Sequence, residues 1–159
     1  MSAATLDDRG IVVVCPHCGQ KNRLLYERLG ETTRCARCKE TLPAPAEPID
    51  VDSAPHFDAL VARARLPVVV DYWAPWCGPC RMVAPEIQKV AARQQGRLVI
   101  VKVDTDALGD LGNRFGIQSI PTMAVFAGGR EVARTSGARP ARDIEAFVSQ
   151  AIARESSCL

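Results

Sequence analysis

The chain has 159 residues, which is enough for one ordinary domain with a small appendage. Apolar residues make up 47% and charged residues 24%, proportions of a globular protein that argue against a disordered chain. No apolar run approaches the roughly 18 residues that a membrane-spanning helix needs. The formal net charge is only +2, so no strongly basic surface supports a prediction of nucleic-acid binding. The unusual feature is the count of seven cysteines.

The first ten residues carry acidic side chains early and contain no apolar segment followed by a cleavage site. We therefore expect no secretory signal and a cytoplasmic protein. In the reducing cytosol, paired cysteines bind metals or perform redox chemistry more often than they form structural disulfides. We therefore expect the cysteine pairs of this chain to bind a metal or to perform redox chemistry.

A proline-rich segment, residues 43–48, divides the chain in two. It holds three prolines in six residues, and proline biases its neighbours toward extended conformations. It therefore predicts a short, semi-rigid linker between a small domain of residues 1–42 and a larger domain of residues 49–159. Four cysteines precede the linker, and one pair follows it. Cys158 belongs to no pair, and we expect a thiol on a frayed tail.

The small domain is too short to bury a stable core without a metal, disulfides or a partner. Its two Cys-x-x-Cys pairs, separated by 16 residues, have the spacing of a four-cysteine zinc site. Strands at residues 12–14 and 21–25 would give the outline of a zinc ribbon. Plain thiols or two disulfides are alternatives, and His17 could replace one of the four sulfurs. The predicted ligands of a structural Zn²⁺ are Cys15, Cys18, Cys35 and Cys38.

The larger domain alternates strands and helices. The apolar, β-branched run at 67–74 is typical of a strand covered on both faces, and Gly128-Gly129 indicates a β-hairpin. We expect strands at residues 48–51, 67–74, 98–103, 122–127 and 131–136. We expect helices after a capping Asp52 or Ser53, after the third cysteine pair, at residues 108–115 and from Pro140. This order predicts an α/β fold with a mixed central sheet and helices on both faces, preceded by the zinc ribbon.

The third cysteine pair, Cys77 and Cys80, lies where a predicted strand ends and a helix begins. Unpaired N–H groups at a helix N-terminus carry partial positive charge and stabilise an anion. A thiol at Cys77 would therefore lose its proton readily and become a good nucleophile. Cys80 follows one turn later, and Gly78 and Pro79 allow a tight turn, so the pair could close a disulfide.

Residues 71–80, Asp-Tyr-Trp-Ala-Pro-Trp-Cys-Gly-Pro-Cys, resemble the active-site signature of the thioredoxin family. Residues 116–122, Gly-Ile-Gln-Ser-Ile-Pro-Thr, resemble the family's cis-proline loop. With four cysteines in front, the chain is similar to the bacterial thioredoxin-2 type, which has an N-terminal zinc ribbon. The resemblance covers nearly all of residues 10–155 and implies the thioredoxin fold.

The resemblance implies a protein-disulfide reductase. Cys77 would attack a substrate disulfide, and Cys80 would resolve the mixed disulfide. Asp71 would be the buried carboxylate that accepts the proton of Cys80, with its pKa raised by burial. Lys102 would be the lysine that accompanies this carboxylate. The implied substrate-binding residues, which include the cis-proline at position 121, are Trp76, Gly78, Pro79, Ile120, Pro121, Gly137 and Ala138.

The resemblance also implies partners: disulfide-containing protein substrates, and a thioredoxin reductase that recharges the dithiol with NADPH. The sequence has no Gly-x-Gly-x-x-Gly fingerprint, so we expect no bound nucleotide. We also expect a monomer that binds no membrane. Two alternatives stay open: a zinc-ribbon module that binds nucleic acid or protein, and a disulfide isomerase or holdase. Acidic residues offset the arginines of the small domain, so nucleic acid is the less favoured partner.

Overall fold

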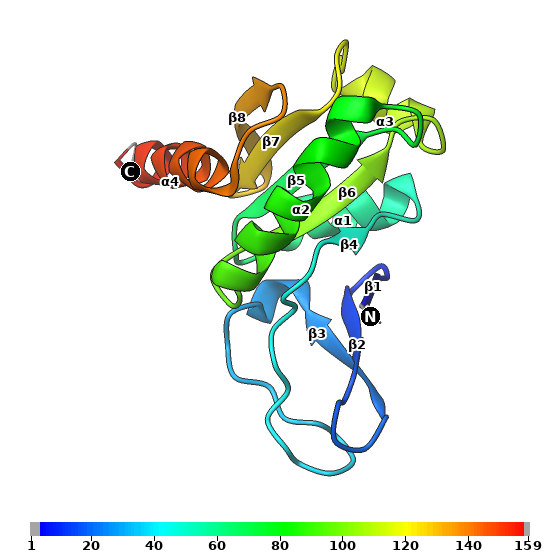
Figure 1. Cartoon of the computed structure of the whole chain (residues 1–159). Coiled ribbons are helices and arrows are strands. Elements are labelled where there is room, and N and C mark those ends of the chain that lie inside the picture. The colour runs from blue at the N-terminus through cyan, green and yellow to red at the C-terminus, as the bar shows by residue number, and fades with distance from the viewer. Residues whose placement is uncertain (1–3, 158–159) are drawn as a thin grey trace.

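The computed structural model describes residues 4–157, so the prediction for Cys158 lies outside the described residues. Figure 1 shows a small N-terminal sheet next to a larger sheet that helices cover on both faces. Within residues 4–157, no helix is both long and apolar enough to cross a membrane.

The N-terminal sheet has three antiparallel strands in the order β1-β2-β3. These are β1 (Thr5–Leu6), β2 (Gly10–Val14) and β3 (Lys21–Leu25), followed by the 3₁₀ turn η1 (Tyr26–Arg28). The two strands expected around the first cysteine pair are present, although β2 begins two residues earlier than predicted. Strand β1 was not predicted, because two residues are too few to show an alternation of apolar and polar side chains.

The larger sheet has five strands in the order β4-β6-β5-β7-β8. Strands β4, β6 and β5 are parallel, whereas β7 pairs antiparallel with both β5 and β8, so the sheet is mixed as predicted. The strand bounds are β4 (Ile49–Asp50), β5 (Val68–Trp73), β6 (Val99–Asp104), β7 (Thr122–Ala127) and β8 (Arg130–Ser136).

Four helices accompany this sheet: α1 (Ala54–Arg63), α2 (Gly78–Arg93), α3 (Gly109–Arg114) and α4 (Ala141–Ser157). Of the two capping residues considered for α1, Ser53 is the cap, and its side chain accepts the N–H of His56. Pro85 lies inside α2. The predicted positions of the helices are therefore confirmed to within a few residues.

Strand β5 is buried on both faces and separates two apolar layers. On one face, Val70 belongs to the cluster that contains Phe57 of α1 and Leu111 of α3. On the other face, Val69 packs with α2 and α4, for example with Ile87. Because side chains alternate along a strand, Asp71 follows Val69 onto the face covered by α2.

The N-terminal sheet does not have a separate core. Its apolar side chains, Tyr26 and Leu24 among them, form one continuous cluster with residues of the larger sheet and of α1. The backbone N–H of Arg65 donates to the carbonyl oxygen of Tyr26 over 2.9 Å. Gln95, which follows α2, donates from Nε2 to the carbonyl oxygen of Ala44 in the linker over 2.7 Å. Hydrophobic contacts and hydrogen bonds thus join the two parts.

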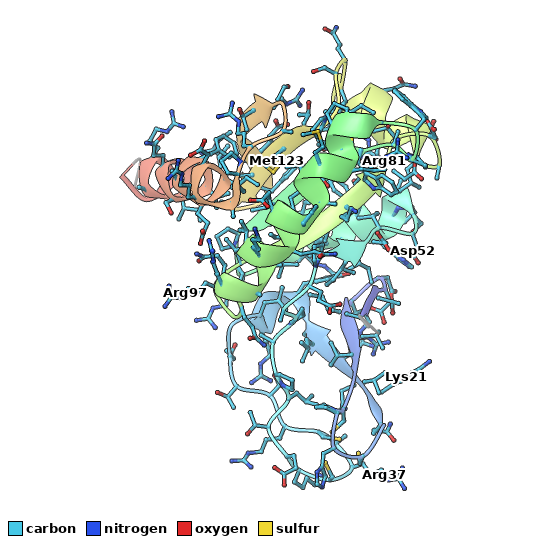
Figure 2. All side chains as sticks on the ribbon, in the orientation of Figure 1. Lys21, Arg37, Asp52, Arg81, Arg97 and Met123 are labelled. Atoms are coloured by element: carbon cyan, nitrogen blue, oxygen red, sulfur yellow. A yellow bond between two sulfur atoms is a disulfide. The ribbon has the colours of Figure 1, made fainter. Side chains whose placement is uncertain are left out.

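The third cysteine pair and the first two pairs lie far apart. Figure 2 places Arg81, next to Cys80, in the upper part of the molecule and Arg37, between Cys35 and Cys38, at its lower end. Any influence of one group of cysteines on the other must therefore pass through the shared core rather than by direct contact.

Candidate functional site

Cys77 and Cys80 form a disulfide at the start of α2. Their Cα atoms are 5.3 Å apart, because the chain makes its first helical turn between them. Cys77 is the N-cap of the helix, and its Sγ accepts the backbone N–H of Cys80 over 3.2 Å. Pro79 occupies the first helical turn, where its missing N–H costs no helical hydrogen bond. The first turn of the helix therefore directs the N–H of Cys80, which has no carbonyl partner within the helix, at the sulfur of Cys77.

A groove of about 500 Å³ opens beside the disulfide. Both cysteines are only 4% exposed, so overall exposure does not distinguish them. The groove distinguishes the two cysteines, because Cys77 lines it and Cys80 does not. Its other walls come from Trp76, Gly78, Pro79, Thr105 and the loop 117–120. A partner molecule in this groove would meet Cys77 first.

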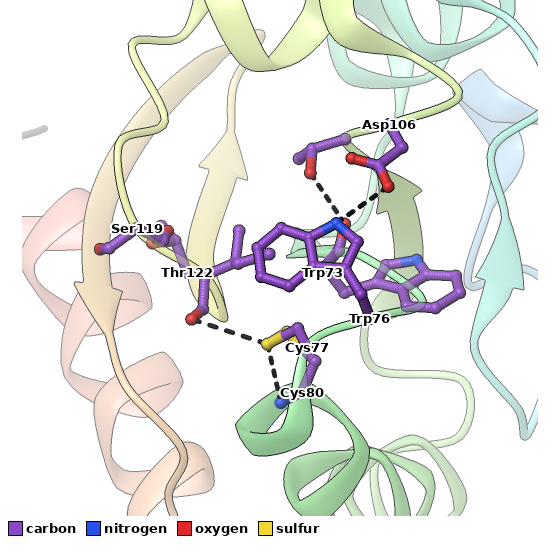
Figure 3. The surroundings of a disulfide bond; sticks show 9 residues. Trp73, Trp76, Cys77, Cys80, Asp106, Ser119 and Thr122 are labelled. Carbon is purple, nitrogen blue, oxygen red and sulfur yellow. Dashed lines mark hydrogen bonds between the residues drawn. A yellow bond between two sulfur atoms is a disulfide. The ribbon is translucent and has the colours of Figure 1, made fainter.

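Trp76 is the most prominent apolar side chain at the groove, with 68% of its surface exposed. Its indole Nε1 donates to a carboxylate oxygen of Asp106 over 3.0 Å (Figure 3). This bond holds a large exposed ring in a fixed place. Asp106 was not predicted as a site residue, because nothing local to residues 104–107 shows which ring their side chains will contact.

The loop before β7 crosses close to the disulfide. The Ile120–Pro121 peptide bond is cis, as the resemblance implied. The Ile120 carbonyl oxygen lies 3.8 Å from Sγ of Cys77, and the carbonyl oxygen of Pro121 accepts the N–H of Gly137 over 2.9 Å. Ala138 is exposed beside Gly137 but does not line the groove. The structure thus brings Trp76, Gly78, Pro79 and Ile120 together around Cys77, and Gly137 contacts the same loop through Pro121.

Asp71 is buried on the α2 face of β5, with 1% of its surface exposed. Its Oδ1 has no hydrogen-bond partner among residues 4–157. Burial raises the pKa of Asp71 to about 6, and the positive charge of Lys102 partly opposes this rise. Lys102 is the neighbour of Asp71 across the β5–β6 pairing, and its Nζ lies 4.5 Å from the ring centroid of Trp73. The carboxyl group is therefore able to exchange a proton near neutral pH.

The first two cysteine pairs converge at the far end of the N-terminal sheet. Their four Sγ atoms all lie within 4.8 Å of one another, and the Cys15–Cys38 and Cys18–Cys35 pairs are 3.7 and 3.6 Å apart. The side-chain amide of Asn22 and the N–H of Arg37 donate to Cys35 Sγ, each over 3.4 Å. His17 is exposed and lies outside this cluster.

Two family models match consecutive segments of the chain. The model described as Thioredoxin matches residues 48–150, which is more than half of the chain. The chain belongs to the thioredoxin family. The zinc-ribbon model described as Thioredoxin 2, N-terminal, matches residues 14–40. This thioredoxin therefore carries an N-terminal zinc-ribbon segment, as the resemblance implied.

Comparison with individual proteins agrees with this assignment. The chain is 37% identical to Thioredoxin C-3 of Corynebacterium nephridii over 145 residues, or 91% of this chain and 98% of that protein. It is 44% identical to Thioredoxin 1 of Chlorobaculum tepidum over 96 residues, or 60% and 95% of the two chains. Among solved structures, chloroplastic thioredoxin z is similar with a TM-score of 0.61 and 34% identity, covering 67% of this chain and 96% of that one. A mutant thioredoxin from Halobacterium salinarum NRC-1 has a TM-score of 0.62 and 26% identity, covering 67% and 92%.

Thioredoxins are thiol–disulfide oxidoreductases, and this thioredoxin has the redox disulfide that the activity requires. The fold and enzyme class predicted from the sequence are therefore confirmed.

Proposed function

We propose that this thioredoxin is a protein-disulfide reductase that works through the dithiol of Cys77 and Cys80. A thioredoxin reductase that draws electrons from NADPH would return the oxidised pair to the dithiol. The observation that carries the proposal is the asymmetry of the pair: Cys77 alone lines the groove and accepts a backbone N–H at the start of α2. A cytoplasmic location, where such a reductant works, fits this function.

In the reduced enzyme, Cys77 is the attacking thiolate, since the helix N-terminus and the Cys80 N–H stabilise its negative charge. It attacks one sulfur of a substrate disulfide, forming a mixed disulfide and releasing the other sulfur as a thiolate. Cys80 then attacks the Cys77 sulfur and releases the second substrate sulfur. Two electrons and two protons thus pass from the dithiol to the substrate, and the Cys77–Cys80 disulfide remains.

Asp71 is the proposed proton acceptor for Cys80, because a thiol must lose its proton before it can attack. A carboxyl group with a pKa near 6 is charged at neutral pH and able to accept a proton during the reaction. Lys102 stabilises the charged form. Oδ1 of Asp71 has no hydrogen-bond partner within the described residues, and in the proposed mechanism a water molecule between Asp71 and Cys80 would carry the proton.

The groove is the proposed site for a substrate segment that carries the disulfide. The loop 117–120 lines the groove beside Cys77, with the Ile120 carbonyl oxygen 3.8 Å from the Cys77 Sγ, so an extended segment could pair with its backbone. Trp76, Gly78 and Pro79 would provide the facing apolar wall, with Ile120 on the loop side. Gly137 and Ala138 would extend this surface beyond the groove.

The four-cysteine cluster is the proposed site of a structural Zn²⁺. Sulfurs placed tetrahedrally about 2.3 Å from zinc are about 3.8 Å apart, close to the separations of 3.7 Å for Cys15–Cys38 and 3.6 Å for Cys18–Cys35. The residues present therefore fit the ion. Bound zinc would hold the two turns together, and four thiolate ligands leave no open position for substrate. Residues 1–42 would then form a zinc-ribbon domain, residues 43–48 a linker, and residues 49–159 the thioredoxin domain.

The decisive experiment is insulin reduction coupled to NADPH oxidation by a thioredoxin reductase. Wild-type protein should turn over, and Cys77→Ser should fall to the rate without enzyme. Cys38→Ser is the matched control, because it removes an equivalent sulfur from the other cluster and should lower zinc content while turnover persists. Wild-type protein that supports no NADPH-coupled reduction of insulin, and does not accelerate its reduction above the rate with dithiothreitol alone, would refute the reductase function.

A further inference from the structure

Three charged residues form a row across the face of the sheet that α2 covers. Lys102 of β6 lies directly opposite Asp71 in the parallel pairing with β5. On its other side, Lys102 lies directly opposite Asp50 of β4. Residues paired in register on adjacent strands point to the same face. The lysine therefore lies between two carboxylates, one on each neighbouring strand.

The row runs from solvent to the protein interior. Asp50 is exposed, Lys102 is half-buried, and Asp71 is 1% exposed with one carboxylate oxygen lacking a hydrogen bond. A cavity of about 170 Å³ under α2 is lined by Glu47, Asp50 and Lys102, among others. Such a volume has room for several water molecules. The outer half of the row thus borders a cavity that has room for water, whereas its inner end is buried.

The ammonium group of Lys102 can be drawn in two directions. Toward the inner end it lies over the ring of Trp73, with Nζ 4.5 Å from the ring centroid, on the same face as Asp71. Toward the outer end, the cavity offers the carboxylates of Asp50 and Glu47. Because a lysine side chain is long and flexible, the balance of these charges decides which position of the ammonium group is more populated.

We propose that Asp50 is a positioning residue of the redox site: by attracting Lys102 outward, it limits how strongly the lysine stabilises the charged form of Asp71. The inference rests on the proposed function, in which Asp71 accepts the proton of Cys80. Direct repulsion between the two carboxylates is secondary, since two strand spacings separate them by about 10 Å. Asp50 acts through the lysine.

Among the described residues, the other side chains around Asp71 do not provide a second charge that would mask the effect of Lys102. Lys102 is the charged neighbour contributed by β6, whereas β7 places the uncharged Met123 opposite Asp71. Helix α2 contributes the redox cysteines in its first turn and the neutral Gln88 at the cavity. Glu47 faces the cavity from the linker and draws the lysine in the same direction as Asp50.

The test is the titration of Asp71 in the oxidised protein, followed by NMR of its side-chain carboxyl carbon. In Asp50→Asn the lysine should turn inward, and the pKa of Asp71 should fall by about half a unit. Asp50→Glu should restore the wild-type value. The matched control is Asp52→Asn, which makes the same charge change two residues away at a carboxylate that accepts from His56 Nδ1. It should leave the titration of Asp71 unchanged.

Repeating the titration in a variant without the lysine tests whether Asp50 acts through Lys102. In Lys102→Met, adding Asp50→Asn should shift Asp71 by less than a third of the shift seen with the lysine present. An equal shift in both backgrounds would overturn the proposal, as would no shift in the wild-type background. Asp50 is exposed, and the dispersion of the NMR spectrum shows directly whether each variant is folded.

The pH profile of insulin reduction separates this inference from the proposed function. If Asp71 accepts the proton of Cys80, the acid limb of the profile moves to lower pH in Asp50→Asn by the same amount as the NMR titration. A shifted titration with an unmoved acid limb would support the positioning by Asp50 and refute the role of Asp71 in proton transfer. An unshifted titration refutes the positioning, whatever the enzyme's activity.

Discussion

The chain uses the Cys-x-x-Cys spacing three times and obtains two different structures from it. In the four-cysteine cluster, each pair lies in a tight turn that ends at a residue with positive φ, Gly19 at 83° and Lys39 at 68°. These turns direct sulfurs from separate segments toward a common point. At Cys77 the same spacing starts a helix, and the two sulfurs bond to each other. The backbone conformation around the pair, and not its spacing, therefore decides the chemistry.

The two regions also differ in what stabilises them. The redox pair lies on a sheet with apolar layers on both faces. The four-cysteine end has few apolar side chains of its own, and its buried residues join the cluster of the larger sheet through Tyr26, Leu29 and Leu42. The first region should keep its structure without metal, whereas the second depends on metal at one end and on the shared core at the other.

Of the changes considered, removal of the metal should produce the largest difference in stability between the two regions. Closing a four-cysteine zinc site contributes on the order of 10 kcal/mol to folding, so a strong chelator should unfold the turns at the cluster. Hydrogen exchange should accelerate in β2 and β3 and remain slow in β5 and β6. Released zinc, counted with a colorimetric chelator, gives the stoichiometry. A metal-free protein with unchanged exchange in β2 would contradict the dependence on metal.

Tyr26→Ala should weaken the connection between the regions. Tyr26 is fully buried, its hydroxyl donates to the Asp7 carbonyl oxygen over 2.7 Å, and its carbonyl accepts from Arg65. Truncating a buried aromatic ring costs about 3–5 kcal/mol, measured by urea unfolding with tryptophan fluorescence. Both tryptophans lie in the larger part, so the signal reports whether the loss is transmitted.

Tyr26→Phe is the matched control, because it keeps the ring and removes one hydrogen bond worth about 1 kcal/mol. If Tyr26→Ala accelerated hydrogen exchange in β2 without changing the urea midpoint of the unfolding transition seen by tryptophan fluorescence, the two regions would be independent folding units.

Asp71→Ala should make the redox region more stable at neutral pH. Burial raises the pKa of Asp71 from 3.8 to about 6, so the native state binds this proton more tightly than the unfolded state does. The wild type therefore loses stability as the pH rises from about 4 through 6, by about 3 kcal/mol in total. The variant lacks this loss, and its advantage in the free energy of unfolding should be small at pH 4 and nearly complete at pH 7.5.

Urea unfolding of the oxidised proteins at both pH values measures this advantage. The control Asp110→Asn changes an exposed carboxylate and should show the same difference from wild type at each pH. An advantage of Asp71→Ala that did not grow with pH would show that burial leaves the carboxyl group's proton affinity unaltered.

Much of this structure could be predicted from local patterns. The apolar run 67–74 predicted a strand that is covered on both faces. The position of Cys77 between a strand and a helix predicted that its sulfur lies at the N-terminus of that helix. Both signals lie within a few residues of sequence. The expected convergence of four cysteines followed from spacing and the chemistry of thiolates.

The features that escaped prediction depend on contacts between distant segments. Asp106 becomes the anchor of Trp76 only through the conformation of the loop after β6. The placement of Asp50 beside Lys102 depends on the register of two parallel strands, which no periodicity reveals. The shared core around Tyr26 likewise arises from the packing of one part against the other.

The smallest predicted effect compares the two turns of the four-cysteine cluster directly. Lys39 adopts a positive φ of 68°, a conformation that costs a residue with a side chain about 1 kcal/mol relative to glycine. Lys39→Gly should therefore tighten zinc binding about two- to fivefold in a chelator competition, with the lost bond from Lys39 Nζ to the Ala36 carbonyl opposing part of the gain. Gly19→Ala is the reciprocal change, because an added Cβ would meet no atom within 4 Å and only backbone strain is introduced. It should weaken binding by a similar factor. If both variants shifted the affinity in the same direction, backbone strain at these two positions would not control the geometry of the sulfurs.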